Sequence, residues 1–419
     1  MKKVIGILAV VAFASSIASA ELLKNVQYSG SVEVKSVTTD NYPGFDKDLK
    51  NKHSETMPRV ILGINFDLND DVNAQVTAAK LDRQYGDTST AGQTIDNATS
   101  VIVFSEAYLN LKNVIGINHK VGRMHFGNPG DIVVYFGPSP TAVAAFSVSA
   151  LDAWYGEWTK DKWTVAALMG KVVENSQTAM RDSDVYGVTA AYDYSEIVKT
   201  SVYVYQLDDR IANVKADKPN VAGVKVTGKY QGVGYGAEFA MNSGNSSTVD
   251  YTGNAMKADV DYSLDVKTAG KFEFMGGYAM GSGNDDSIGT ADKTEGFKAI
   301  NHNYVPGLLF SGVGMGAAQA DGLTNLTTFN LGANWTPEKL NKLTVGAKFF
   351  NFAYTSDKVT GVTDKPIGTE LDFTATWNHS DNVGLTASYA MFTPDQKFAG
   401  AGNPTDAATL LGFDLAVKF

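Results

Sequence analysis

The stretch "LLGFDLAVKF", residues 410–419, ends the chain, and its alternation decides the fold class. Strand side chains point to opposite faces in turn. One face therefore carries the apolar row Leu411, Phe413, Leu415, Val417 and Phe419. The other face carries the mixed row Leu410, Gly412, Asp414, Ala416 and Lys418. A strand with so apolar a face needs an apolar solvent on that side, and the mixed row indicates water on the other.

The segment "MKKVIGILAVVAFASSIASA", residues 1–20, has the composition of a cleaved secretory signal peptide. Lys2 and Lys3 form a basic start, an apolar run covers residues 4–13, and small residues precede Glu21. The apolar run is shorter than the ~20 residues that a membrane-spanning helix requires. We therefore expect residues 1–20 to be removed and residues 21–419 to form a single domain.

The composition excludes several classes of protein. The formal net charge is −10 and becomes more negative once the two lysines of the signal peptide are removed, so we expect no nucleic-acid partner. There is no cysteine, which excludes a disulfide framework and a thiolate metal site. The expected mature chain has no run of ~18 apolar residues that would form a spanning helix. Barrel strands escape such a search, because they present lipid-facing side chains only at every second residue.

The alternation of the last strand recurs along the chain. "AMKADVDYSLDV" from Ala255 and "TELDFTATWN" from Thr369 alternate apolar and polar residues without interruption. Large aromatic residues fall in the apolar row near the expected strand ends, as in the aromatic girdles of membrane barrels. These residues are Tyr28, Tyr192, Tyr230, Tyr262, Trp335, Trp377 and Phe419.

Short and long connections take turns along the sequence. Short turns are expected at Asn69, Asn113, Lys160, Ser195, Gln231, Lys267, Pro337 and Ser380. Longer segments rich in Gly, Asn, Asp and Thr separate them, so that both termini fall on the short-turn side. The sequence therefore predicts an all-β fold, a transmembrane antiparallel β-barrel of about eighteen strands in the bacterial outer membrane, with short periplasmic turns and long extracellular loops. A merged hairpin would reduce the count to about sixteen.

Catalytic motifs are not supported by the sequence. Residues 223–229, "GVKVTGK", fit the start of a phosphate-binding loop, but Tyr230 stands where Ser or Thr is required and the stretch alternates as a strand. His119 and His125 could share a strand face, although histidines that line the pore or its rim explain them more simply. We expect no enzymatic activity, no metal and no cofactor.

Charged residues of the polar rows indicate a wet lumen with an electric field across it. Neighbouring early strands contribute Arg59, Arg83, Arg123 and Lys171. Strands farther around the barrel contribute Glu238, Asp259, Asp261, Glu273, Glu370 and Asp372. Asp259 and Asp261 would also suit acid/base work or Ca²⁺, but hydration of the lumen is the simpler explanation. The predicted pore-lining or constriction set is Arg59, Arg83, Glu106, Arg123, His125, Lys171, Asp259, Asp261, Glu370 and Asp372.

Two long connections have unusual compositions. The stretch "GNPGDIVVYFGPSPTAVAAF" from Gly127, within the connection at residues 127–148, is too apolar for an exposed loop, and we expect it to fold into the lumen. Residues 281–322 contain an acidic part and the apolar part "YVPGLLFSGVGMGAA". A plug, a lid and an external patch remain open for this second connection.

Residues 106–131, "EAYLNLKNVIGINHKVGRMHFGNPGD", resemble a known hairpin. A strand, a short turn and a strand with Gly-Arg before an aromatic residue and Gly are similar to the "GRQ…YG" hairpin of bacterial porins, above all alginate-export-type eighteen-strand barrels. The resemblance implies that Arg123 lines the constriction. The chain has only five arginines, however, whereas alginate exporters use an arginine-rich pathway.

Together these features predict a channel for passive passage of small hydrophilic or charged solutes, with saccharides among the candidates. Tyr203 and Tyr205 could stack on sugar rings or belong to an aromatic girdle. The alternative is a surface-structural or adhesive barrel with a plugged pore. The expected partners are the outer-membrane lipid bilayer, small hydrophilic solutes, and the barrel assembly machinery, which would recognise Phe419.

Overall fold

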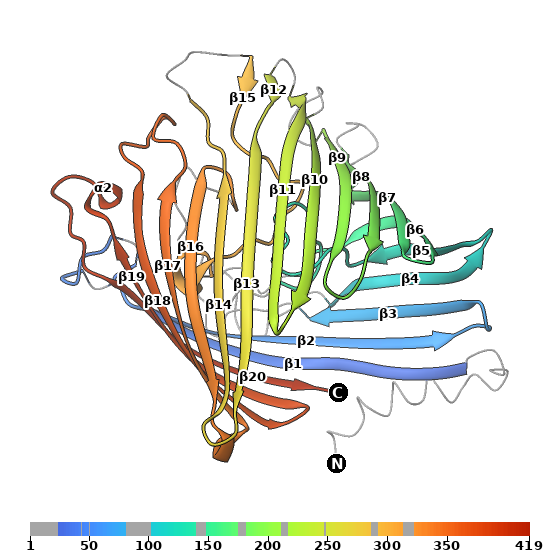
Figure 1. Cartoon of the computed structure of the whole chain (residues 1–419), viewed down its shortest axis with the longest axis horizontal. Helices are drawn as coiled ribbons and strands as arrows, with labels where there is room; N and C mark the ends of the chain where they lie inside the picture. Colours follow the sequence, from blue (N-terminus) through green and yellow to red (C-terminus); the bar gives the residue numbers. More distant parts are fainter. Residues whose placement is uncertain are drawn as a thin grey trace, which may run out of the picture.

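A computed structural model of the chain shows one β-sheet that curls until its ends meet (Figure 1). It describes residues 24–42, 44–49, 51–80, 102–139, 148–174, 182–210, 217–246, 249–285, 292–312 and 322–419. The predicted signal peptide at residues 1–20 and the predicted pore residue Arg83 lie outside the described residues. Short helical turns in the described part are η3 (Gly307–Ser311), η4 (Glu338–Leu340) and α2 (Gln396–Ala399). Within these ranges no helix is long and apolar enough to cross a membrane.

The barrel wall consists of long antiparallel strands. The first nine are β1 (Lys24–Asp40), β2 (His53–Asp67), β3 (Val72–Lys80), β4 (Ile102–Val114), β5 (Ile117–Met124), β6 (Leu151–Lys160), β7 (Trp163–Val173), β8 (Ser183–Asp193) and β9 (Lys199–Asp209). The wall continues with β10 (Asp217–Tyr230), β11 (Val233–Ser246), β13 (Asn254–Val266), β14 (Gly270–Gly281), β16 (Leu326–Thr336), β17 (Leu343–Tyr354), β18 (Pro366–Ser380), β19 (Val383–Pro394) and β20 (Ala408–Lys418). The short strands β12 (Val249–Tyr251) and β15 (Lys293–Thr294) pair in parallel beyond the wall (Figure 1).

Closure joins the first strand to the last. β1 pairs with β20 from Ser31 opposite Lys418 to Asp40 opposite Thr409. Phe419 extends this ladder, because its N–H donates to the Gly30 carbonyl at 3.0 Å and its carbonyl accepts from the Gly30 N–H at 2.8 Å. A Cβ at position 30 would lie 2.8 Å from the Phe419 ring, so glycine allows this close approach. The predicted eighteen-strand barrel is confirmed, and the count of sixteen is wrong.

The turns fix which strands become neighbours. Each predicted short turn joins two consecutive wall strands, and all of them lie at one end of the barrel, the short-turn end. In the turn between β10 and β11, Gln231 and Gly232 have φ values of 48° and 85°, as a tight two-residue hairpin requires. Residues 223–229, the stretch that resembles a phosphate-binding loop, lie within β10 and pair with β9 and β11.

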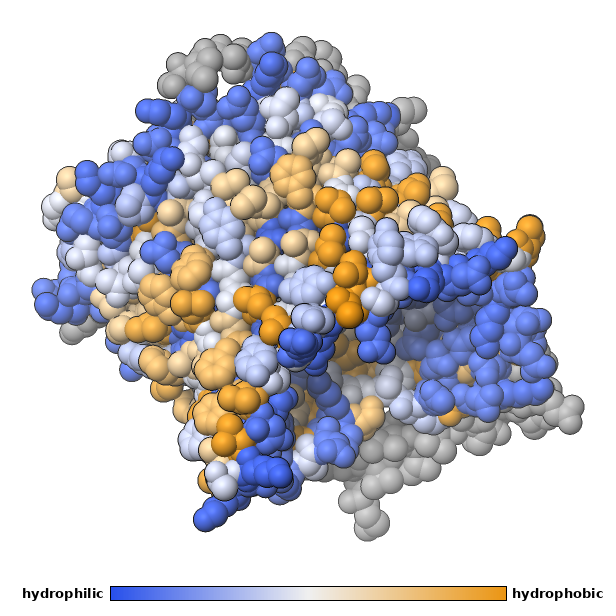
Figure 2. Space-filling model, viewed as in Figure 1, coloured by the Kyte–Doolittle hydropathy of each residue, from blue (hydrophilic) through white to orange (hydrophobic). Residues whose placement is uncertain are grey.

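The two faces of the wall differ as the alternation predicts. In β20, Leu411 and Phe413 are 46% and 56% exposed on the outer face, whereas Leu410 is 1% exposed on the inner face. The predicted girdle residues Tyr28, Tyr230 and Phe419 are exposed as well. Figure 2 shows the resulting apolar band across the visible outer face, with hydrophilic residues toward both ends.

The hydrophobic core lies inside the barrel. One cluster joins inward side chains of β5 to β14 to residues 132–136, and a second joins inward side chains of β16 to β20 and β1 to η3. Side chains from so many consecutive strands meet only on the concave side of the sheet, which identifies that side as the lumen. The described part of the connection at residues 127–148 therefore folds inward as predicted.

Candidate functional site

The first inward segment, residues 126–139, leaves the end of β5 and enters the lumen. Phe126 and Phe136 exchange backbone hydrogen bonds of 2.8 and 2.7 Å, which close the segment into a narrow loop. The Asp131 carboxylate accepts a hydrogen bond from the Lys225 ammonium of β10 at 3.1 Å. This ion pair fastens the loop to β10, five strands farther along the wall.

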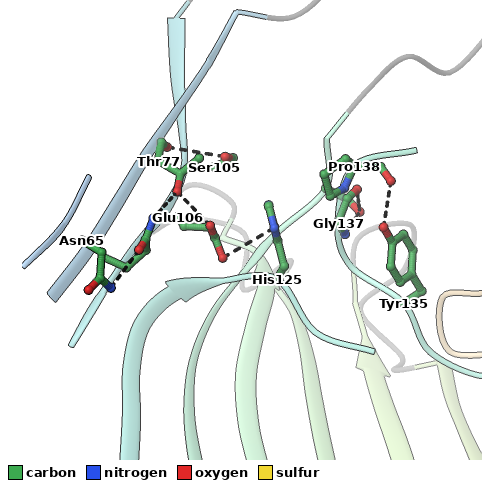
Figure 3. Close-up of polar contacts among 10 residues, drawn as sticks. Asn65, Thr77, Ser105, Glu106, His125, Tyr135, Gly137 and Pro138 are labelled. Atoms are coloured by element: carbon green, nitrogen blue, oxygen red, sulfur yellow. Dashed lines mark hydrogen bonds and ion pairs between the residues drawn. The ribbon is translucent and has the colours of Figure 1, made fainter. Parts of the chain in front are cut away.

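Arg59 fastens the far end of the same segment. Its Nη1 donates to the Ser139 carbonyl at 3.0 Å, and its Nη2 donates to Glu33 Oε2 at 2.6 Å. Within the segment the Tyr135 hydroxyl donates to the Pro138 carbonyl at 2.7 Å (Figure 3). Arg59 thus lies inside the barrel as predicted, but it is only 6% exposed and acts as a clamp on the loop.

The second inward segment, residues 297–312, pairs with the first. The Ile300 N–H donates to the Val133 carbonyl at 3.0 Å, and the Asn303 N–H donates to the Asp131 carbonyl at 2.9 Å. The Asn301 side chain also donates to the Tyr135 carbonyl at 2.6 Å. The two segments therefore form one inner unit. Residues 297–312 of the second connection are neither a lid nor an external patch, whereas β15 of the same connection lies beyond the wall.

Buried carboxylates hold the second segment to the wall. The Glu370 side chain accepts hydrogen bonds from the N–H groups of Leu309 and Phe310 at 2.7 and 2.8 Å, and Asp372 accepts from Leu308 at 3.1 Å. The first turn of η3 exposes N–H groups without intrahelical partners, and the carboxylates satisfy them. Gly307 has φ 79°, and a Cβ there would lie 2.8 Å from the Glu370 carboxylate. Glycine is therefore needed where the carboxylate approaches.

Aromatic stacking completes this attachment. The Phe310 ring stacks on Phe352 with centroids 4.1 Å apart, and both side chains are 1% exposed. The centroid of the Phe392 ring lies 5.9 Å from that of the Phe310 ring. Such buried aromatic contacts exclude water from the carboxylate bonds and strengthen them.

A cavity of about 430 Å³, the lumen cavity, lies between the first inward segment and β5 to β11. Its lining combines both signs of charge with aromatic rings and includes Lys120, His125, Phe126, Asp131, Tyr155, Tyr203, Tyr205, Lys225 and Glu238. Lys225 lies 3.8 Å from Glu238, whose carboxylate accepts the Tyr203 hydroxyl at 2.6 Å. The cavity can therefore contact a solute that carries either charge.

A second cavity of about 570 Å³ lies toward the short-turn end of the same wall. It is lined by Asp67, Asn73, Asn110 and Asn118 among others. Lys120 and Tyr155 line both cavities, so the two spaces adjoin. Polar amides and charges thus follow the wall from the short-turn mouth to the inner unit.

Glu106 and His125 meet beside the lumen cavity (Figure 3). Glu106 accepts the Thr77 hydroxyl at 2.8 Å and lies 3.5 Å from His125 Nδ1. His125 lies one residue beyond β5, and burial lowers the pKa of its imidazole, although Glu106 acts in the opposite direction. The Lys120 ammonium lies 3.9 Å from the centre of the Tyr108 ring, a cation–π contact.

The acidic residues predicted for the pore all lie on inward faces but differ in environment. Asp259 and Asp261 of β13 are exposed to the wet lumen, and Asp259 is paired with Lys257 at 2.8 Å. Glu370 and Asp372 are buried beneath η3, at 0% and 6% exposed. Asp259 and Asp261 of β13 therefore hydrate the lumen. Glu370 and Asp372 of β18 instead accept hydrogen bonds from backbone N–H groups of η3.

Two predicted pore residues lie on the other side of the wall. Arg123 is flanked by the inward Met124, and Lys171 by the inward Val172, so both side chains point outward. Arg123 is paired with Asp152 through two hydrogen bonds of 2.7 Å. The prediction that Arg123 and Lys171 line the constriction is wrong. The early strands therefore contribute fewer basic side chains to the lumen than the sequence indicated. Beyond the apolar band the outer face is also polar, so a charge there does not identify the lumen.

The same reassignment separates the two histidines. His119 accepts a hydrogen bond from the outward Trp154 indole at 3.1 Å, whereas His125 faces the lumen, so they share no face. Sequence reasoning missed Lys120 and Lys225, which supply the basic charge of the lumen cavity. The alternation of the strands could have identified them. Lys120 lies four residues before the inward Met124, and Lys225 lies four residues after the inward Val221, so each shares its neighbour's face. Among the described residues no three His, Asp or Glu side chains gather to hold a metal ion.

The closed barrel, its outer apolar band and its narrowed wet lumen define an outer-membrane channel of the porin class. The chain belongs to the alginate export family, whose model matches residues 51–406. The resemblance seen in the sequence is thereby confirmed, as is the outer membrane as its location.

Solved structures of similar fold include three proteins of Pseudomonas aeruginosa. OpdQ has a TM-score of 0.62 at 12% sequence identity, and the alignment covers 96% of this chain and 99% of the OpdQ chain. OccK11 (OpdR) has a TM-score of 0.61 at 12% identity, with coverages of 95% and 97%. OpdK, solved with vanillate, has a TM-score of 0.59 at 9% identity, with coverages of 94% and 98%. At these identities the likeness shows the fold. No curated protein sequence matches the chain.

Proposed function

We propose that the channel passes small hydrophilic solutes passively, and that the lumen cavity selects small charged or dipolar ones. The observation that supports this most directly is the lumen cavity itself, about 430 Å³ in volume, whose lining includes Lys120 and the cluster of Lys225 with Asp131 and Glu238. Paired charges of both signs orient a dipolar solute and cost little to release it, as conduction requires.

A long polyanionic sugar fits this lumen poorly. Arg59 is already paired with Glu33, and Arg123 lies outside the lumen. The basic groups of the cavity are lysines interleaved with carboxylates, which repel a chain of carboxylated sugars. We therefore place the solute among small molecules, with monosaccharides and small organic acids as the two classes to test.

The aromatic lining supports contact with a solute ring in one place. Tyr203 and Tyr205 face inward, so they are not girdle residues, but each is only 7% exposed beneath the first inward segment. Tyr155, which lines both cavities, is the better stacking surface. Transport of this kind involves no covalent step, and the proposed channel is not an enzyme.

The rival function is a plugged surface-structural or adhesive barrel. It is favoured by one observation, the mutual pairing of the two inward segments through Ile300, Asn301 and Asn303. A unit held so firmly on both sides of the lumen would seal the barrel if the adjoining cavities did not connect to the long-loop end.

Planar-bilayer recording of the purified protein separates the two functions. We expect stepwise conductance that is partly blocked by added monosaccharide, vanillate or another small organic acid. Replacing residues 132–136 by a short glycine linker should raise the conductance, because it removes the buried apolar tip of the first inward segment. Silent bilayers for both proteins, with loop-dependent binding to cells, would establish the plugged barrel instead.

Two features of the termini belong to the proposal as well. We propose that residues 1–20 are removed on export, which amino-terminal sequencing starting at Glu21 would demonstrate. We also propose that assembly machinery recognises Phe419, which is 55% exposed at the end of the closing strand. Phe419→Ala should lower the amount of folded barrel in the membrane, and Phe413→Ala is the control on the same face.

A further inference from the structure

A third cavity, the η3 cavity, lies between the second inward segment and the wall strands β14, β16, β17 and β18. Its volume is about 270 Å³, and Val305, Gly307 and Leu308 form its side toward the inner unit. It shares no lining residue with the lumen cavity or with the cavity at the short-turn end. It is therefore a separate space within the barrel.

Two opposite charges line the η3 cavity without pairing. Lys348 of β17 lies directly opposite Asp372 of β18 in the strand register, and both side chains line the cavity. The Cβ atoms of such cross-strand pairs are about 4.5–5.5 Å apart, which is close enough for an ion pair. Within the described residues, however, the Lys348 ammonium and the Asp372 carboxylate form no ion pair.

Each of the two charges is held by a different neighbour. The Lys348 ammonium lies 4.9 Å from the centre of the Phe350 ring, a cation–π contact. Asp372 Oδ2 accepts the Leu308 N–H at 3.1 Å. Asp372 Oδ1 is buried and has no hydrogen-bond partner among the residues that the structure describes, and the residue is only 6% exposed. A buried carboxylate oxygen without a donor is rare in folded proteins and calls for an explanation.

The neighbouring Glu370 does not provide the missing donor. Both of its oxygens accept N–H groups of η3, from Leu309 and Phe310. A proton shared by the adjoining carboxyl groups of Glu370 and Asp372 would still leave the pair one negative charge. The described residues therefore leave a negative pair and an unpaired ammonium on the same cavity.

These groups suit a solute that carries both charges close together. An ammonium group can donate to Asp372 Oδ1, and a carboxylate of the same molecule can accept from the donors of Lys348. The volume lies just below the about 300 Å³ at which pockets for drug-sized ligands begin, so the solute must be small. The floor of the cavity, with Asn334 and Thr374, is polar as well.

We propose that the η3 cavity binds small α-amino acids, with the ammonium group on Asp372 and the carboxylate on Lys348. The inference rests on the proposed channel function, since an amino acid reaches this cavity through the lumen. It adds a second solute site on the side of β14 to β18 and assigns the class of solute that the site takes.

Saturation-transfer NMR of the purified full-length barrel in detergent tests the site with four matched probes. Glycine carries both charges, acetate only the carboxylate, methylamine only the ammonium, and trimethylglycine a cation without an N–H donor. Glycine should bind at least about tenfold more tightly than each of the other three, since each of them lacks a charge-assisted hydrogen bond. Equal binding of the four probes, or no binding of glycine, would overturn the proposal.

Two substitutions assign the two ends of the solute. Lys348→Met should abolish the preference for glycine over methylamine, and Asp372→Asn should abolish the preference for glycine over acetate. Each preference compares two probes on one protein, so a partial loss of stability does not imitate the result. The control Lys271→Met removes a lysine paired with Glu273 at the short-turn end and should retain both preferences. Unchanged preferences in Lys348→Met and Asp372→Asn would contradict the assignment.

A variant of the lumen cavity separates this proposal from the channel function. If Lys225→Met loses the preference for glycine and Lys348→Met retains it, the amino acid binds in the lumen cavity. That result would overturn the η3 site and leave the proposed function standing. Silent planar bilayers together with the expected four-probe pattern would overturn the channel and leave the η3 site standing.

Discussion

The two inward segments narrow the same lumen but are held to the wall by different physics. The first segment is fastened by side-chain ion pairs, Asp131 to Lys225 and the Arg59 clamp, next to a water-accessible cavity. The second is fastened by its own backbone, whose N–H groups reach Glu370 in a dry aromatic cluster. An ion pair beside water is weak and adjustable, whereas a buried carboxylate that satisfies several N–H groups is costly to remove.

This difference assigns separate roles to the segments. The second segment provides a rigid support on the side of β16 to β20, because breaking it leaves unsatisfied buried N–H groups. The first segment borders the cavity and contributes its charge, so small changes there should alter selectivity more than stability. Substitutions in each segment test this division of roles.

The largest expected effect is the removal of the stacked ring of the second segment. Phe310→Ala should lower the free energy of unfolding by about 3–5 kcal/mol, because it leaves a cavity beside Phe352 and Phe392. Urea unfolding in detergent measures the loss. The outward Phe329→Ala, which leaves no internal cavity, is the control, and an equal loss in both variants would contradict the assigned support.

The next effect concerns the carboxylate beneath η3. Glu370→Ala should cost about 2–4 kcal/mol in the same assay, since the N–H groups of Leu309 and Phe310 lose their acceptor. Glu370→Gln retains one acceptor oxygen and should cost less. Single-channel conductance should rise or become noisy in the alanine variant, whereas unchanged stability and conductance would show that the segment is held by other contacts.

A smaller effect on stability and a clear effect on selectivity are expected at the first segment. Lys225→Met should cost about 1 kcal/mol and leave Asp131 and Glu238 uncompensated, which shifts the reversal potential in a salt gradient toward cations. Glu238→Gln should shift it toward anions. Shifts of the same sign in both variants would contradict the placement of these charges along the conducting path.

The pH dependence is expected to be smaller still. Burial lowers the pKa of His125, so on acidification the unfolded chain binds a proton before the folded barrel does. Stability should therefore fall as the pH falls below the ordinary histidine pKa of about 6.5. Unfolding at neutral and at mildly acidic pH should show a shallower loss for His125→Gln than for the wild type. An identical slope would contradict this protonation order.

The smallest effect on conduction is expected outside the lumen. Arg123→Glu should leave the reversal potential unchanged, because Arg123 points outward and pairs with Asp152. A shift toward cations would restore Arg123 to the conducting path.

Alternation and turn chemistry made the wall predictable. The short turns, the closing strand and the outward row of residues 410–419 follow from local sequence, because each depends only on neighbours along the chain. Arg123 shows where this reasoning stops. Its motif and charge indicated the lumen. Because the adjacent Met124 faces the lumen, however, Arg123 faces outward. The preceding Gly122 has a positive φ of 126°. Both faces are polar above the apolar band, so local composition no longer separates them.

By itself the sequence determined a closed antiparallel barrel with lipid outside and water inside, because the period of two and the turn lengths are local properties of the chain. The apolar composition of residues 127–148 also indicated that this connection enters the lumen, but the contacts that hold both inward segments there are visible only in the folded barrel. The attachment of η3 to Glu370 joins residues about sixty positions apart, and the pairing of Asn303 with Asp131 joins residues still farther apart. Contacts across a cylinder depend on how far each loop reaches after closure, and no local pattern encodes that distance.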